Sequence, residues 1–372
     1  MDRKIFDLYE FKIMRFFSLD CHIGIKDLQV IFSQLGHSLD IWSISDHHFI
    51  MNWPRQKVDI VNQYTWMNLN QNMCDAFYER YKNELKDYDG FICFYPPAFS
   101  LLYEKFHKPI IIQIPLRYET PFFNDITRWK WLNSYLQGKI DNKTIISVTN
   151  NKYDQQYFQK FVKRECQLIP SLCDYTNSSY TGKNNKFLYC SKFESFKDWL
   201  PECDIVTKSV MKGYSWQDVA DFKAIIHMPY SNTLMSVFEQ YSMNIPLLFP
   251  SKEFLIQLWQ RYSKQGVMSE LSFRQIFNLT PKSLIDCEGL DPNNYENQNS
   301  FVEWSGLSDF YDPEWMPYIE LYDSVSELLY KLNSLDFSGI SDKMRVFNVE
   351  RKEKILNKWE KVINGIIDRL DG

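Results

Sequence analysis

The chain has 372 residues, 45% of them apolar, which is enough for two or three domains with buried cores and excludes a disordered or fibrous protein. The formal net charge is −5 and the 42 Lys and Arg residues are scattered, so nucleic acid is not an expected partner. The opening residues lack a secretory signal, and no apolar run approaches the roughly 20 residues that span a bilayer, so we expect a cytoplasmic protein without a transmembrane segment.

Alternating apolar runs and amphipathic stretches in the first half predict a doubly wound parallel sheet. The run from Pro109 to Ile114 is apolar at every position except Gln113, which is typical of a strand buried on both faces. Strands are expected near residues 13–17, 38–42, 90–94, 109–114 and 144–148, and helices near 25–35, 98–106 and 152–161. These elements predict an N-terminal Rossmann-like domain over residues 1–170.

The second half repeats the α/β pattern after a polar stretch at residues 174–185, which is typical of an exposed linker. Strands are expected near residues 187–190, 224–228, 245–249 and 317–322, with helices at 231–243 and from the capping box that begins at Ser324. We therefore predict a second Rossmann-like domain over 171–342, with an irregular insertion at about 252–316. An amphipathic helix is expected over 343–372.

Eight cysteines are spread singly along the chain, with no C-x-x-C pair among them. A chain of this size does not need disulfide bonds to stabilise its core. We therefore expect reduced thiols, most of them in the core.

Three segments resemble glycosyltransferases of the B fold. They are Leu35–Asp40, Ile169–Asp174 and His227–Pro250, and together they cover about a sixth of the chain. The third is the most specific, because Phe238-Glu239 on a helix is followed by Pro246 seven residues after Glu239. The resemblance implies two Rossmann-like doubly wound domains that face a cleft, with the C-terminal helix crossing back to the N-terminal domain. It also implies transfer of a sugar from a nucleotide-sugar donor to a glycan or another hydroxyl acceptor.

A donor site is predicted at the helix expected over 231–243. Backbone N–H groups at a helix N-terminus can hold a diphosphate without a metal, and Glu239, about two turns further on, could accept both ribose hydroxyls. The alternative is a surface helix with a Ser N-cap and a solvated Glu239. The candidate donor-binding residues are Ser231, Asn232, Thr233, Glu239, Tyr230, His227, Lys192, Lys212 and Gly24.

The loop after the first strand carries Asp20 and His22, and it resembles the loop in which inverting enzymes of this fold hold a general base. The pKa of an unperturbed imidazole lies near working pH, which suits His22 to that role. Asp20 would orient His22 or act as the base, although a His bonded to backbone is an equally open interpretation. Arg117 and Glu119 are expected on the acceptor side, or as a surface ion pair.

The stereochemical expectation rests on Ser231. Retaining members of the family often carry a second Glu eight residues before the ribose-binding one, and Ser231 stands there in this chain. This favours an inverting enzyme.

No metal and no cofactor other than the nucleotide-sugar co-substrate are expected. The D-x-D pattern at Asp87 and Asp89 precedes a strand, whereas a metal pair should follow one. Adjacent residues such as His47 and His48 point to opposite faces in an extended segment and would chelate one ion poorly.

Two other functions remain open. A nucleotide-sugar epimerase or a pyruvyl-type transferase on the same scaffold would keep the donor helix. A non-catalytic module that binds a sugar nucleotide or a protein is favoured by Ser231 in place of an acidic residue.

Overall fold

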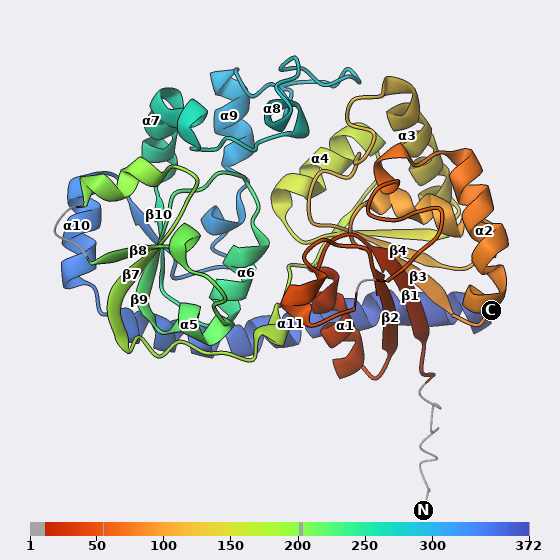
Figure 1. Ribbon diagram of the computed structural model, residues 1–372, viewed down its shortest axis with the longest axis horizontal. Coiled ribbons are helices and arrows are strands. Elements are labelled where there is room, and N and C mark those ends of the chain that lie inside the picture. The colour runs from red at the N-terminus through yellow and green to blue at the C-terminus, as the bar shows by residue number, and fades with distance from the viewer. Residues whose placement is uncertain (1–11, 55, 201–203, 372) are drawn as a thin grey trace, which may run out of the picture.

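The computed structural model describes residues 12–54, 56–200 and 204–371, and it contains two α/β domains joined by a linker and one long helix (Figure 1). The first eleven residues and Cys203, which entered the expectations above, lie outside the described residues. The seven described cysteines are free thiols. Among the described helices, none is both long and apolar enough to cross a membrane.

The N-terminal domain has a six-stranded parallel sheet in the order β2-β1-β3-β4-β5-β6. Its strands are β1 (Arg15–Asp20), β2 (Ser38–Ser43), β3 (Gly90–Cys93), β4 (Ile110–Ile114), β5 (Ile145–Thr149) and β6 (Gln167–Leu168). Its α-helices are α1 (Ile25–Gln34), α2 (Gln71–Leu85), α3 (Ile126–Asp141) and α4 (Lys152–Val162), and its 3₁₀ segments are η1 (His48–Met51), η2 (Trp66–Asn68) and η3 (Pro97–Phe106). All five residues of β4 are buried, as its apolar run predicts.

The C-terminal domain has a five-stranded parallel sheet in the order β11-β10-β9-β7-β8. Its strands are β7 (Asn184–Cys190), β8 (Ile205–Thr207), β9 (Phe222–His227), β10 (Leu247–Pro250) and β11 (Glu320–Tyr322). Its α-helices are α5 (Trp216–Ala220), α6 (Met235–Ser242), α7 (Lys252–Tyr262), α8 (Phe273–Ile276), α9 (Gln298–Ser305), α10 (Val325–Ser334) and α11 (Phe337–Asp371). Its 3₁₀ segments are η4 (Asp174–Thr176), η5 (Glu194–Trp199), η6 (Lys208–Val210), η7 (Ser263–Gln265) and η8 (Asp309–Tyr311).

Helix α11 ties the two domains together. Its 35 residues make it about 52 Å long, and it runs beneath both sheets in Figure 1. Phe337 and Met344 near its start pack in the core of the C-terminal domain, whereas Ile355, Trp359 and Ile363 pack with α1 under the N-terminal sheet. The expected crossing helix is therefore confirmed, and with it the fold class, although the helix begins at Phe337 rather than near residue 343.

The insertion at 252–316 is less irregular than expected, because it contains α7, α8 and α9. Its side chains also reach the other domain. Trp304 of α9 is 5% exposed and belongs to the core that α2, α3 and α4 form over the N-terminal sheet. Tyr153 of α4 packs edge-on against Trp304, with ring centroids 5.5 Å apart. The insertion is therefore a third connection between the domains.

Three local details differ from the prediction: a helix type, a helix start and a capping box. The segment expected as a helix near 98–106 is the 3₁₀ segment η3. Helix α6 begins at Met235, four residues later than predicted. The expected capping box is half formed, because Ser324 accepts from the Glu327 N–H but the Glu327 carboxylate accepts from Asp323 rather than from Ser324.

The strand orders place a topological switch point in each sheet. The chain leaves β1 on one side to form β2 and later returns on the other side as β3, and it does the same around β7 with β8 and β9. In open parallel sheets, ligands bind outside the carboxyl ends of the strands at such a point. The fold thus predicts sites beyond Asp20 in one domain and beyond Cys190 in the other.

Candidate active site

Asp20 ends β1 at the N-terminal switch point, where both of its carboxylate oxygens are already used. Oδ1 accepts from the N–H of His22 at 2.8 Å, and Oδ2 accepts from the N–H groups of Phe94 and Tyr95 at 3.1 and 2.8 Å. Burial raises the pKa of Asp20 to about 8, while these backbone hydrogen bonds act to lower it. Asp20 therefore joins β1 to the segment after β3, and it does not orient the His22 ring.

The structure brings His22 to the switch point but in the wrong tautomer for the expected base. Its Nδ1 accepts from the N–H of Gly24 at 3.0 Å, and since a backbone N–H can only donate, a neutral ring carries its proton on Nε2. Burial lowers the pKa of His22 to about 4. The ring also stacks on Phe94, with centroids 5.7 Å apart. His22 is therefore a neutral N–H donor in this arrangement, and a general base would need the opposite tautomer.

Gly24 has a packing role at the start of α1. A Cβ added there would lie 2.7 Å from the ring of Phe94 and 2.9 Å from Nδ1 of His22. Such contacts leave no room for a side chain, so glycine allows the His22 ring to approach the helix. The predicted contact of Gly24 with donor phosphates stays a prediction.

Arg117 and Glu119 follow β4 and are buried beneath the insertion, each 1% exposed. Arg117 donates to the carbonyl of Leu271 at 2.5 Å and lies over the ring of Phe273. Glu119 accepts from the hydroxyl of Tyr157 at 2.9 Å, and burial raises the pKa of its carboxyl to about 7. They form no exposed acceptor surface and no surface ion pair, because the insertion covers them.

The predicted phosphate-binding loop at 231–233 is also covered by the insertion. All three of its residues are buried, with exposures of 4%, 1% and 8% (Ser231, Asn232, Thr233). The hydroxyl of Ser231 donates to the carbonyl of Glu270, and the side chain of Asn232 accepts from Ser308. Because α6 begins only at Met235, these residues precede its first turn and bind the insertion instead of presenting a helix N-terminus.

His227 at the end of β9 is a core residue. Its Nε2 lies 2.7 Å from Oε1 of Gln240, and its ring stacks on Phe249 with centroids 4.4 Å apart. Burial lowers the pKa of His227 to about 3, so the ring is neutral. At 2% exposed it is not placed to bind a donor, contrary to the prediction.

Glu239 lies on α6, where it meets the linker between the domains. The hydroxyl of Tyr175 donates to its Oε1 at 2.6 Å. Burial raises the pKa of Glu239, and the Tyr175 hydrogen bond and the charge of Lys208 act in the opposite direction. No other side chain within the described ranges hydrogen bonds to this carboxylate, so one oxygen is available to a ligand. Glu239 is therefore neither a solvated surface residue nor part of a closed ion pair.

Lys208 is the residue that the sequence reasoning missed. It directly follows the three-residue strand β8, at the carboxyl edge of the C-terminal sheet. Burial acts to lower its pKa, yet the pKa is raised because Cys190, Tyr214 and Glu239 lie nearby. Among the residues that the structure describes, none forms an ion pair or a hydrogen bond with its ammonium group. Its position one residue after a strand was the available signal, but β8 is too short to show a pattern.

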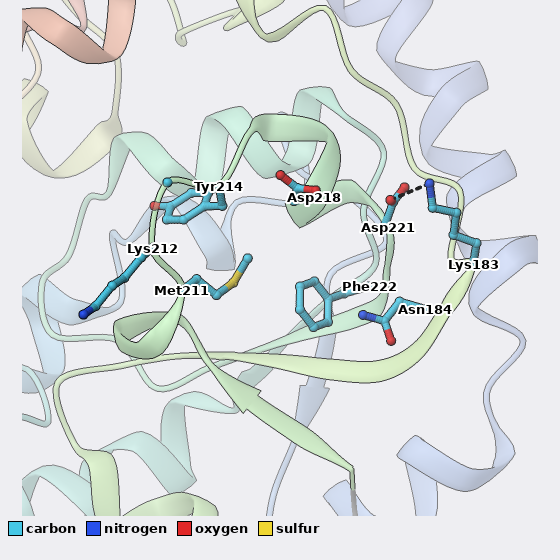
Figure 2. A pocket seen from close by; sticks show the side chains of 9 residues that line it. Lys183, Asn184, Met211, Lys212, Tyr214, Asp218, Asp221 and Phe222 are labelled. Carbon is cyan, nitrogen blue, oxygen red and sulfur yellow. Dashed lines mark ion pairs between the residues drawn. The ribbon is translucent and has the colours of Figure 1, made fainter.

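The two lysines that were predicted differ in their surroundings. Lys192 follows β7 at the switch point, lies 4.7 Å from the ring of Tyr230 and pairs with Glu270 of the insertion. Lys212 is exposed and lines a groove of about 710 Å³ (Figure 2). That groove reaches Asn184 and Phe222, the first residues of β7 and β9, so it extends to the opposite edge of the sheet. Lys212 is not grouped with Glu239.

The acidic and imidazole pairs discounted above have local partners. Asp89 accepts from the N–H of Arg15 at 2.7 Å, at the amino end of β1, and Nδ1 of His48 lies 2.6 Å from the carbonyl oxygen of Trp53. Over residues 12–54, 56–200 and 204–371, no three His, Cys, Asp or Glu side chains gather as potential metal ligands.

Comparisons with known proteins complete the description of the site. No family model matches the chain, and no curated protein matches it. Among solved structures, the glycosyltransferase of kitacinnamycin is 8% identical with a TM-score of 0.45, over 95% of this chain and 99% of that one. The spinosyn forosaminyltransferase SpnP is 8% identical with a TM-score of 0.44, over 95% and 100% of the two chains. The glycosyltransferase SnogD from Streptomyces nogalater is 11% identical with a TM-score of 0.39, over 86% and 99%. Values this low assign no residue and no reaction to this chain.

Proposed function

We propose that the chain is a cytoplasmic glycosyltransferase that moves a sugar from a nucleoside diphosphate sugar to a hydroxyl acceptor, with inversion and without a metal. The donor nucleotide would bind at the C-terminal switch point and the acceptor beyond β1 of the other domain. The observation that carries this proposal is the Glu239 carboxylate within electrostatic range of the Lys208 ammonium, which no described residue neutralises by an ion pair. The free thiols of the described cysteines suit a reducing compartment.

To bind the donor, the site needs a hydrogen-bond acceptor for the two ribose hydroxyls and a cationic group for the diphosphate, both on the same edge of the sheet. Glu239 offers the free carboxylate oxygen for ribose hydroxyls, and Tyr175 holds the other oxygen in place. Lys192, which lies over the ring of Tyr230, and Lys208, whose charge acts on Tyr230, supply positive charge for the diphosphate. Two lysines can take the place of the divalent ion that other enzymes use at a diphosphate.

The N-terminal domain contributes His22, whose Nδ1 accepts from the N–H of Gly24, so that a neutral ring carries its proton on Nε2. We propose that Nε2–H donates to an oxygen that gains negative charge as the glycosidic bond to the diphosphate breaks. Burial keeps the imidazole neutral above about pH 4, so this donor is present throughout the neutral range. Such a preorganised donor stabilises the transition state without itself changing protonation.

Inversion is proposed because no carboxylate stands at Ser231. The Ser231 hydroxyl is buried and donates to the carbonyl of Glu270, so it is not available to form a covalent sugar intermediate. Direct displacement by the acceptor oxygen is the simplest reaction that remains. The new glycosidic bond forms as the bond to the diphosphate breaks, the electron pair of the broken bond passes to the diphosphate, and the proton of the acceptor hydroxyl passes to solvent water.

A panel of UDP-, GDP-, dTDP- and CMP-sugars tests this function. We expect one nucleoside diphosphate sugar to raise the melting temperature and to be turned over equally well with and without EDTA, because a bound ligand stabilises by RT ln(1 + [L]/Kd). NMR of the product should show an inverted anomeric centre. Turnover lost in EDTA and restored by Mn²⁺ would contradict metal independence, and a donor-only incubation that yields an epimer would favour the epimerase. Binding without any turnover would favour the non-catalytic module.

A further inference from the structure

The short segment from Gly266 to Leu271 lies across the C-terminal switch point. A Cβ on Gly266 would lie 2.7 Å from the carbonyl carbon of Lys192, which shows how closely the segment packs there. The N–H of Met268 donates to the carbonyl of Pro229 at 2.9 Å, and the N–H of Glu270 donates to the carbonyl of Tyr230 at 2.8 Å. The segment is therefore fixed directly above the loop that follows β9.

Glu270 is the acidic residue of this segment, and its backbone is held from both domains. Its carbonyl accepts from Ser231 at 3.2 Å and from Arg117 of the N-terminal domain at 3.3 Å. Its carboxylate pairs with Lys192 and is 27% exposed. The hydrogen-bonded backbone on both sides fixes the main chain of Glu270, so its side chain starts within reach of Lys192.

We infer that the Glu270 carboxylate occupies the place of the donor diphosphate on Lys192, so that a donor must displace it to bind. This inference rests on the donor site proposed above. It explains why the two lysines of that site differ: Lys192 is neutralised by Glu270, whereas Lys208 makes no ion pair within the described residues. Ligands with a strong anion displace the carboxylate more readily than a nucleoside does, so Glu270 selects for a diphosphate.

The same residue connects donor binding to the contact between domains. Arg117 donates to the carbonyls of both Glu270 and Leu271, and Tyr153 donates to Leu271 at 3.3 Å. Both donors belong to the N-terminal domain, so that domain positions the carboxylate that closes the anion site. Displacement of the Glu270 side chain requires only rotation of that side chain, because the interdomain hydrogen bonds are made by its backbone.

Inorganic pyrophosphate is the probe, because it tests the anion site without knowledge of the base or the sugar. Titration calorimetry of the full chain should show pyrophosphate binding about 3- to 10-fold tighter in Glu270→Gln than in wild type, since an internal competitor of modest strength is removed. Glu296→Gln, on the same insertion and without an ion pair in the described chain, should bind as wild type does. In a Lys192→Ala background, Glu270→Gln should bring no gain.

The outcomes separate this inference from the proposed function. Pyrophosphate binding that is weakened by Lys192→Ala but equal in wild type and Glu270→Gln would overturn the role of Glu270 and leave the donor site intact. An equal gain in pyrophosphate affinity from Glu270→Gln with and without Lys192 would also overturn the role of Glu270. The gain would then come from the loss of one negative charge and not from the release of Lys192. No pyrophosphate binding to wild type or to Glu270→Gln would overturn the donor site as well.

Discussion

Replacing His22 by alanine is expected to lower kcat for sugar transfer by about 10²- to 10³-fold, because a preorganised hydrogen-bond donor at the reacting centre is lost. Donor affinity should change much less than kcat, because this hydrogen bond gains strength only as negative charge builds on the departing oxygen in the transition state. Steady-state kinetics over pH 5–8 measure both quantities. Because burial lowers the pKa of His22 to about 4, its ring stays neutral in this window, and His22 should cause no acidic loss of activity there.

His22→Gln is the matched control, because a glutamine amide can place an N–H donor near the position of Nε2 but cannot act as a base. We expect it to retain activity within about tenfold of wild type, and thermal melting will show whether both variants fold. A glutamine variant as inactive as the alanine variant, with a wild-type acidic limb near pH 6 that the substitution removes, would restore the general-base role that the sequence favoured.

Replacing Trp359 by alanine is expected to destabilise the chain by about 3–5 kcal/mol, as large-to-small substitutions of buried aromatic residues do. Trp359 is fully buried in the middle of α11 and packs against Phe32 of α1, with ring centroids 5.8 Å apart. Its loss would leave a cavity where the crossing helix supports the N-terminal sheet. Urea unfolding followed by far-UV circular dichroism measures the effect.

Val349→Ala is the control for helix propensity, because Val349 is 71% exposed on the same helix. Its effect should stay within about 0.5 kcal/mol. If the two substitutions destabilise equally, α11 does not brace the N-terminal domain in the way that the structure shows.

The architecture could be predicted because its signals are local. Strand β4 is apolar at every position except Gln113, and all of it is buried, so the apolar run alone identified a central parallel strand. Helix α4 begins where Asn151 caps it through the N–H of Asp154, which is a sequence-readable start. The stripe that includes Ile355 and Trp359 predicted the C-terminal helix, because apolar side chains recur there at helical spacing, whereas its crossing back to the N-terminal domain was implied by the family resemblance.

The site was predicted less well, because the positions and partners of its side chains depend on contacts between residues that are distant in sequence. Ser231 is a normal N-cap candidate, but the insertion bonds to it through Glu270, 39 residues away, and the helix starts later. His22 was found, yet its tautomer depends on the N–H of Gly24 and could not be read from residue types. Lys208 and Lys212 are alike in sequence, and only the pairing of β8 with β7 brings the first within electrostatic range of Glu239.

The affinity of nucleoside diphosphates for matched variants tests the central claim most directly. Titration of UDP, GDP and dTDP against wild type should identify one that binds. Glu239→Ala and Lys208→Ala should each weaken that binding at least tenfold, since a hydrogen bond to a charged group contributes about 1.5–3 kcal/mol. Lys212→Ala changes a residue four positions from Lys208 that lines the groove reaching the opposite edge of the sheet, and this variant should bind within about twofold of wild type. No binding of any of the three, or a loss in Lys212→Ala as large as that in Lys208→Ala, would contradict a donor site at the carboxyl edge of the C-terminal sheet.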